Sequence, residues 1–136
     1  MSLYEINREH FITLKLPFPP SINNYYGSTR GGGKYIKKEG KEFRQKVVDG
    51  LRAFVDDKEP LTDKLQVWVE VYPPNRRKRD LDNLSKALLD ALTHSKIYDD
   101  DFLIDDLRFT RGEIVKGGYV RVHISRIIPN EKTTNT

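Results

Sequence analysis

Residues 65–74, LQVWVEVYPP, alternate apolar and polar side chains more regularly than any other part of this chain. Successive side chains of a β-strand point to opposite faces, so the alternation predicts a strand with one face buried in a core. Pro73 and Pro74 follow directly, and proline cannot donate a hydrogen bond to a neighbouring strand. The strand is therefore expected to end at Tyr72.

Two stretches with helical periodicity lie on either side of this strand. From about Lys38, apolar side chains recur every four residues, which predicts an amphipathic helix. Residues 84–92 follow the i, i+3, i+4, i+7, i+8 pattern of a second one, and Asp80 or Asp82 is expected to cap its start. The apolar positions are Phe43, Val47, Leu51 and Val55 in the first helix and Leu84, Ala87, Leu88, Ala91 and Leu92 in the second.

Three further strands are predicted around these elements. Residues 12–16 alternate until Pro17, Leu107 and Phe109 suggest a strand, and residues 120–124 alternate after a turn at Lys116-Gly117-Gly118. A long loop is expected from Pro19 through the glycines at 31–33. The fold class is thus α+β: one small domain with a mixed, mostly antiparallel sheet of about four strands and two amphipathic helices.

The expected domain spans residues 11–128, between a flexible N-terminal extension (1–10) and a flexible tail (129–136). The 136 residues include no cysteine, which excludes a disulfide scaffold and a thiol nucleophile. The apolar runs are too short to span a membrane, and Glu5, Arg8 and Glu9 stand where a signal peptide needs apolar residues. A soluble cytoplasmic protein without membrane contacts is expected.

Charge is distributed unevenly along the chain. Residues 1–79 carry 16 basic and 10 acidic side chains, and residues 107–136 carry 6 and 2. Residues 80–106 carry eight aspartates against only Lys86 and Lys96. A solvated acidic segment would account for this pattern, and so would a site where a divalent cation offsets the negative charge.

The chemically informative segment is residues 75–86, NRRKRDLDNLSK, in which four cations precede Asp80 and Asp82. If the backbone is extended there, the two carboxylates point to one side, about 6.5–7 Å apart. Oxygen donors at that spacing can share a hard cation such as Mg²⁺. Lys86 lies four residues beyond Asp82, within side-chain reach on a helix, and the Asp99–Asp101 turn could add a further carboxylate.

Each of these features has a simpler interpretation. An isolated Asp-x-Asp is more often a cap or a turn than a metal site, and Lys86 could pair with Asp82 and Asp90 on its own helix. The four cations could belong to a solvated loop. What favours a site is that all these features fall within 26 residues, from 76 to 101.

The combined motifs resemble the signature of the RusA-type Holliday-junction resolvases. The resemblance runs from about residue 12 to residue 127, and Asp-x-Asp-Asn with the later lysine and aspartates is specific in combination. It rests on the segment 79–84 (RDLDNL), Lys86, residues 90–92 (DAL), Asp100-Asp101, Pro19-Pro20-Ser21 with Asn23 and Tyr25-Tyr26, and Lys116-Gly117-Gly118.

The resemblance implies a homodimeric endonuclease that cuts four-way DNA junctions with Mg²⁺, for which Mn²⁺ can substitute, and without an organic cofactor. Asp80 and Asp82 match the first two metal-binding aspartates of the family, and Lys86 matches its essential lysine. The third aspartate falls on Asp101, with Asp100 as the alternative, because three aspartates stand where the family usually has two.

The basic residues are expected to bind DNA phosphates, and tyrosines 25, 26 and 35 are candidates to stack on unpaired bases. One alternative function is a non-catalytic module that binds branched or duplex DNA. Another is a phosphohydrolase of small nucleotides, which would not need so many phosphate contacts. The expected phosphate ligands are Arg76, Arg77, Lys78, Arg79, Lys34, Lys37 and Lys41.

Overall fold

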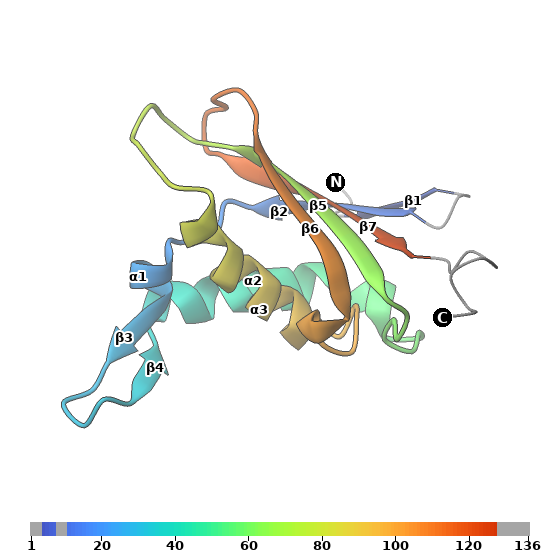
Figure 1. The fold of residues 1–136 in the computed structure, drawn as a ribbon, viewed down its shortest axis with the longest axis horizontal. Coiled ribbons are helices and arrows are strands. Elements are labelled where there is room, and N and C mark those ends of the chain that lie inside the picture. Colours follow the sequence, from blue (N-terminus) through green and yellow to red (C-terminus); the bar gives the residue numbers. More distant parts are fainter. Residues whose placement is uncertain (1–3, 8–10, 128–136) are drawn as a thin grey trace, which may run out of the picture.

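Strand β5 (Leu65–Tyr72) lies inside a five-stranded sheet, between β7 (Tyr119–Arg126) and β6 (Ile104–Arg111) (Figure 1). The computed structural model describes residues 4–7 and 11–127 of the chain. The strand order is β1-β2-β7-β5-β6, where β1 is Tyr4–Asn7 and β2 is Phe11–Pro17. The four predicted strands are confirmed, and β1 adds a fifth.

The sheet is mixed and mostly antiparallel, as predicted. Among the strands that the structure describes, only β5 and β6 pair in parallel, with Val67 opposite Leu107. Parallel neighbours need a crossover connection, which here contains helix α3 (Asp82–Ser95) and a short 3₁₀ turn, η1 (Asp101–Leu103). The crossover therefore places α3, with its aspartates, against the sheet.

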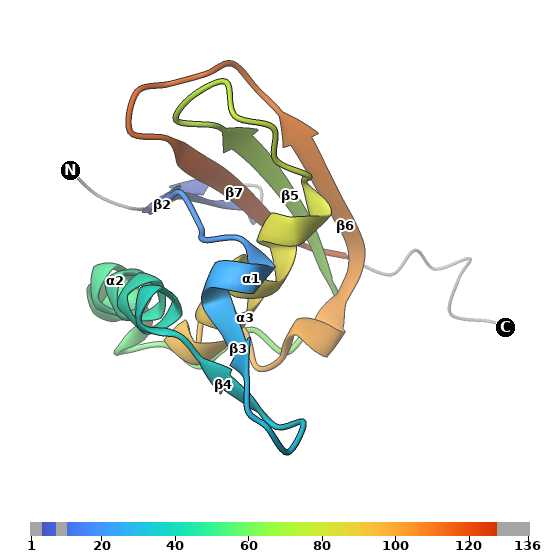
Figure 2. The ribbon, with the colours of Figure 1, turned by 90° about the vertical axis from the view of Figure 1, so that its left-hand side faces the viewer.

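Helices α1 (Ile22–Tyr25), α2 (Lys38–Val55) and α3 lie on the same side of the sheet (Figure 2). The two predicted amphipathic helices, α2 and α3, are confirmed, and they pack against each other. Within residues 4–7 and 11–127, no helix has the length and apolar character needed to cross a membrane.

The core fills the space between the sheet and the helices. On β5 the four apolar positions 65, 67, 69 and 71 are buried, and the intervening side chains face the opposite side of the sheet. The predicted apolar stripes of both helices supply the other half of the core. Buried side chains from the helices are Phe43, Val47, Leu51, Phe54, Leu84, Ala87, Leu88, Ala91 and Leu92.

The segment expected to be a flexible N-terminal extension contributes strand β1. Residues 4–7 pair antiparallel with β2, and Tyr4 lies opposite Leu14. Its four residues, YEIN, alternate apolar and polar side chains, but so short a run does not identify a strand. Residues 1–3, 8–10 and 128–136, and with them the expected tail, lie outside the described residues.

The long loop expected between Pro19 and the glycines is largely ordered into short elements, so that prediction was wrong. It contains α1 and strand β3 (Tyr26–Ser28), which forms a hairpin with β4 (Lys34–Ile36). Gly32, with φ of +84°, lies at the hairpin tip. Elements of three or four residues are too short to show a periodicity.

Gly40 allows α1 to approach α2 closely. A Cβ atom at this buried position would lie 2.8 Å from both the carbonyl oxygen and the ring of Tyr25. The Tyr25 carbonyl also accepts a hydrogen bond from the Lys37 amide, at 2.8 Å. The contact between these helices thus depends on the missing side chain.

We expect Gly40→Ala to lower the free energy of unfolding by about 1–3 kcal/mol, because a backbone atom must move to admit the methyl group. Helix propensity alone would favour alanine by about 1 kcal/mol, so a loss identifies the clash. Urea denaturation measures the change, and Lys46→Ala, at an exposed site on the same helix, is the control. Equal or greater stability of Gly40→Ala would contradict the close packing.

Candidate active site

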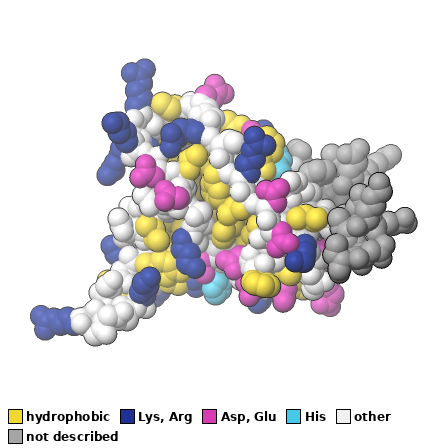
Figure 3. Space-filling view, in the orientation of Figure 1, with side chains coloured by type: hydrophobic (Ala, Val, Ile, Leu, Met, Phe, Trp, Pro, Cys, Tyr) yellow, Lys and Arg dark blue, Asp and Glu magenta, His cyan; other side chains and the backbone are white. Residues whose placement is uncertain are grey.

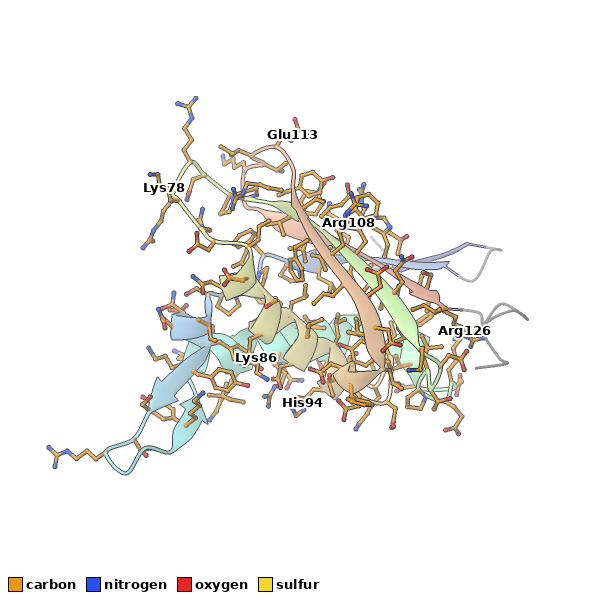
Figure 4. The ribbon with its side chains drawn as sticks, in the orientation of Figure 1. Lys78, Lys86, His94, Arg108, Glu113 and Arg126 are labelled. Carbon is orange, nitrogen blue, oxygen red and sulfur yellow. The ribbon has the colours of Figure 1, made fainter. Side chains whose placement is uncertain are left out.

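The loop between β5 and α3, residues 75–79, presents four cations and is called the basic loop here. Asn75 organises it, because its Oδ1 accepts hydrogen bonds from the Arg77 amide at 3.0 Å and from Arg79 Nη1 at 2.9 Å. Arg79 also lies over the ring of Phe18, 5.4 Å from its centre. Arg76, Arg77 and Lys78 are exposed, and Lys78 projects away from the body (Figure 4).

The other predicted DNA-binding cations lie on the hairpin and the start of α2. Lys34 begins β4, Lys37 is the N-cap of α2, and Lys41 lies in its first turn. All three are exposed. Lysine and arginine side chains gather at the end of the molecule that carries the basic loop and the hairpin tip (Figure 3).

Helix α3 carries Asp82, Lys86 and Asp90 on successive turns, since residues four apart share a helix face. Leu81 is already helical, with φ −61° and ψ −39°, so the extended backbone on which the 6.5–7 Å spacing of the two carboxylates depended is not formed. The N-cap is Leu81, and no side chain in the described part of the chain caps the start of the helix. The predicted cap by Asp80 or Asp82 was wrong.

Backbone carbonyls take over the capping role at the start of α3. The Asn83 amide donates to the Asp80 carbonyl at 3.2 Å, and the Leu84 amide donates to the Leu81 carbonyl at 3.1 Å. A tight turn of this kind satisfies amides that a side chain would otherwise cap. The exposed carboxylates of Asp80 and Asp82 are therefore not used for capping.

The acidic turn at residues 99–101 holds Asp100 and Asp101 in different environments. Asp100 precedes η1, and its Oδ1 accepts a hydrogen bond from the Phe102 amide at 3.1 Å. That bond, with one from Asp101, lowers the pKa of Asp100. Partial burial and the neighbouring Asp100 raise the pKa of Asp101, while the cation of Lys86 acts on it in the opposite direction. Asp101 is thus within electrostatic reach of Lys86.

The described part of the chain does not gather the predicted metal ligands into one cluster. Among residues 4–7 and 11–127, no group of three or more His, Asp or Glu side chains is arranged to hold a metal ion. Carboxylates such as Asp80 and Asp82 nevertheless have the chemistry of Mg²⁺ ligands. Mg²⁺ commonly takes one or two carboxylates and completes its shell with water and substrate phosphate.

A network around Asp90 was not found from the sequence. Asp90 Oδ2 accepts hydrogen bonds from the hydroxyl of Tyr25 and from Arg44 Nη2, the latter at 2.7 Å. Arg44 Nη2 also donates to the Tyr25 hydroxyl at 3.2 Å. Tyr25 is fully buried, so it is not available to stack on bases, whereas Tyr35 is half exposed.

The Asp90 network shifts the ionisation of its members. Burial alone would raise the pKa of Asp90, but the hydrogen bonds from Tyr25 and Arg44 outweigh it and lower that pKa. Burial and the bond to Asp90 raise the pKa of Tyr25. In the sequence, Asp90 was marked by its spacing from Lys86 and by the motif at residues 90–92, and Tyr25 by the motif at residues 25–26, but neither signal indicated that the two side chains bond.

Asp80 lies between two clefts. One, of about 740 Å³, is bounded by residues 17–21, α2 and the basic loop. The other, of about 650 Å³, separates the basic loop from residues 111–114. Asp80 and residues 77–79 line both. A small α+β domain with carboxylates beside a cationic loop has the features expected of an enzyme that acts on a phosphate backbone.

Comparison with known proteins identifies the family. A sequence model of the endodeoxyribonuclease RusA family matches residues 17–126. The chain is 37% identical over 115 residues to a crossover junction endodeoxyribonuclease of Enterobacteria phage HK97, covering 82% of this chain and 92% of that protein. Proteins of the same name from Shigella sonnei and Escherichia coli K12 are 36% and 35% identical, each over 85% of this chain and 94% of their own lengths. The chain belongs to the RusA endodeoxyribonuclease family.

We expect Asp90→Asn to lower the free energy of unfolding at pH 7 by about 1–3 kcal/mol, since it leaves Arg44 half-buried without its counter-charge. The folded-state pKa of Asp90 is lowered, so its contribution is present above the unfolded-state pKa of about 3.9. It is lost as the pH falls through the folded-state value. The titratable groups around it are Tyr25, Arg44, His94, Tyr98 and Asp101.

Urea denaturation of both proteins between pH 3 and pH 7 measures this difference. The stability gap between wild type and Asp90→Asn should narrow as the pH falls below about 4. Asp99→Asn, which alters an exposed aspartate, should show a smaller gap at every pH. A gap that does not change with pH would contradict a charged Asp90 in the network.

Proposed function

We propose that this protein resolves four-way DNA junctions by hydrolysing paired phosphodiester bonds in recombination and repair. The chain is an endodeoxyribonuclease of the RusA family, and its relatives are named for cutting crossover junctions. The observation that carries the proposal is that the basic loop leads directly into Asp80 and into the turns of α3 that bear Asp82 and Lys86. Its DNA substrate makes the cytoplasm the expected location.

The exposed cations bind the substrate in this proposal. Arg76, Arg77 and Lys78 contact backbone phosphates beside the scissile bond, because arginine and lysine at an exposed loop can neutralise several phosphates at once. Arg79 lies over the ring of Phe18 and so stabilises the basic loop, and it also binds the DNA. The hairpin and α2 cations, Lys34, Lys37 and Lys41, extend this surface.

Lys86 acts next to the scissile phosphate. Its ammonium group is exposed on the α3 turn that follows Asp82. A cation there can stabilise negative charge that develops on the phosphate oxygens or orient the attacking water by a hydrogen bond. Both roles need an ammonium group that is not already paired with a carboxylate.

Asp80, Asp82 and Asp101 are the proposed ligands of Mg²⁺, with Mn²⁺ as a substitute. When bound, such an ion neutralises phosphate charge and lowers the pKa of coordinated water. Asp101 is favoured over Asp100 as the third ligand because the Asp100 carboxylate already caps η1. The raised pKa of Asp101 means that its negative charge is costly without a nearby cation, as expected of a metal ligand.

The active species is proposed to be a homodimer. A four-way junction has approximate two-fold symmetry, and a symmetric pair of subunits would present two equivalent sites to two strands. Paired nicks at symmetric positions are the product that this arrangement predicts. A monomeric enzyme would release singly nicked junctions first.

We expect Asp82→Asn to reduce junction cleavage by about a hundredfold or more, since it removes one negative ligand charge while preserving side-chain size. DNA binding in chelator should hold or tighten, because the lost carboxylate repels phosphate. Lys86→Ala should also abolish cleavage but weaken binding or leave it unchanged. Gel assays with a synthetic junction, a linear duplex and free nucleotides, each with Mg²⁺ or chelator, measure both quantities.

Asp99→Asn is the matched control, because it removes the same charge from the neighbouring acidic turn. It should cut at close to the wild-type rate, whereas Asp101→Asn should behave like Asp82→Asn. Cleavage by Asp82→Asn at the wild-type rate would exclude the proposed carboxylate site. Binding without any cleavage by the wild type would favour a non-catalytic DNA-binding module.

Junction affinity should fall log-linearly as salt is added, because binding releases counterions from the DNA. Replacing Arg76 and Arg77 together by alanine should reduce the slope by about one to two units. Fluorescence anisotropy in chelator over a range of salt concentrations measures the slope. An unchanged slope would show that the basic loop does not contact DNA.

A further inference from the structure

Lys86 lies midway between two aspartates on α3, four residues after Asp82 and four before Asp90. Carboxylates at this spacing are the usual partners of a helix lysine. Nevertheless, within the described ranges 4–7 and 11–127, Lys86 forms no ion pair within 4.0 Å. Its side chain is exposed (Figure 4). The ion pairs that offered a simpler interpretation of Lys86 are therefore not formed among the described residues.

The Asp90 carboxylate is directed to other partners. Arg44 on α2 and Tyr25 at the end of α1 both donate to the same oxygen, Oδ2. Only about a fifth of the Arg44 and Asp90 side chains is exposed, at 23% and 21%. A carboxylate held by two donors in a half-buried setting is much less free to reach back along its helix to Lys86.

Arg44 occupies a position that is costly for a cation. It lies partly buried between α2 and α3, and its Nε atom has no hydrogen-bond partner among the described residues. Burial by itself lowers the pKa of Arg44, and its bonds to Asp90 and Tyr25 more than offset this effect. The charged Arg44 side chain is stable at this position only with Asp90 as its counter-charge, and the Asp90 carboxylate depends in the same way on Arg44.

We propose that Arg44 is a positioning residue: it holds the Asp90 carboxylate against α2, which keeps the Lys86 ammonium group unpaired and available to a DNA phosphate. The inference rests on the proposed role of Lys86. Tyr25 contributes a second, neutral donor to the same oxygen.

Arg44→Met retains most of the apolar stem but removes the guanidinium group. Asp90, still half-buried, then has Lys86 as the neighbouring cation on its own helix and is expected to pair with it. Such a pair would be stronger than an exposed i, i+4 pair, so the single-turnover cleavage rate should fall by about threefold to tenfold. Arg44→Lys keeps a cation beside Asp90 and should restore most of the rate.

The decisive variant is the double substitution Arg44→Met with Asp90→Asn. The double variant lacks the carboxylate at position 90 that Arg44→Met releases, and Asp82 is unchanged in both variants, so the double variant should cleave faster than Arg44→Met. A purely structural role for the network predicts the opposite, because both substitutions disrupt the same packing. Arg52→Met is the matched control: it removes a cation from the same helix, where Arg52 pairs only with Asp49 in the described structure, and should cleave at the wild-type rate.

Rates are measured on a four-way junction at saturating protein and Mg²⁺. The temperature is kept well below the thermal unfolding midpoint of each variant, as determined by circular dichroism. Lys86→Ala is included to separate the two hypotheses. If Lys86→Ala is inactive and Arg44→Met cleaves at the wild-type rate, only the present inference fails. If Lys86→Ala cleaves at the wild-type rate, the proposed role of Lys86 fails and the inference with it. A double variant no faster than Arg44→Met would also overturn the inference.

Discussion

The carboxylate of Asp90 joins the three helices of the layer that covers the sheet. It lies on α3 and accepts hydrogen bonds from Tyr25 on α1 and from Arg44 on α2. A carboxylate with two donors in a half-buried environment favours one relative orientation of the helices, because a displaced helix would leave a charge without its partner. Gly40 permits the close contact of α1 with α2 that brings Tyr25 to this point.

The same constraint fixes the direction in which the proposed active-site residues face. Asp82 and Lys86 precede Asp90 on one helix face, so holding Asp90 against α2 sets the rotation of α3 about its axis. The parallel pairing of β5 with β6 constrains the C-terminal end of α3. The crossover between these strands returns the chain from α3 through η1, which contains Asp101, to the sheet. The crossover thereby brings Asp101 within electrostatic reach of Asp90, although 11 residues separate the two in the sequence.

The predictions from the sequence succeeded where an element was long enough for its pattern of apolar side chains to repeat. β5 and helices α2 and α3 each show their periodicity several times, and burial of their apolar faces agrees with it. They failed for β1, α1 and the β3–β4 hairpin, whose few residues are stabilised by pairing or packing with distant segments. The expected side-chain cap of α3 failed because backbone carbonyls bind the first amides of that helix.

The sequence by itself determined the amphipathic elements, the α+β class and the motif that identifies the family, since all of these are properties of residues close together in the chain. Tertiary structure decided which strands pair, that Tyr25 is buried and that Asp90 bonds to Arg44 rather than to Lys86. Local spacing gives Lys86 a carboxylate four residues away on each side, whereas Arg44 has Gly40 and Val48 at those positions. Only the packing of α2 against α3 brings Arg44, 46 residues away in sequence, to 2.7 Å from Asp90 and leaves the nearer lysine exposed.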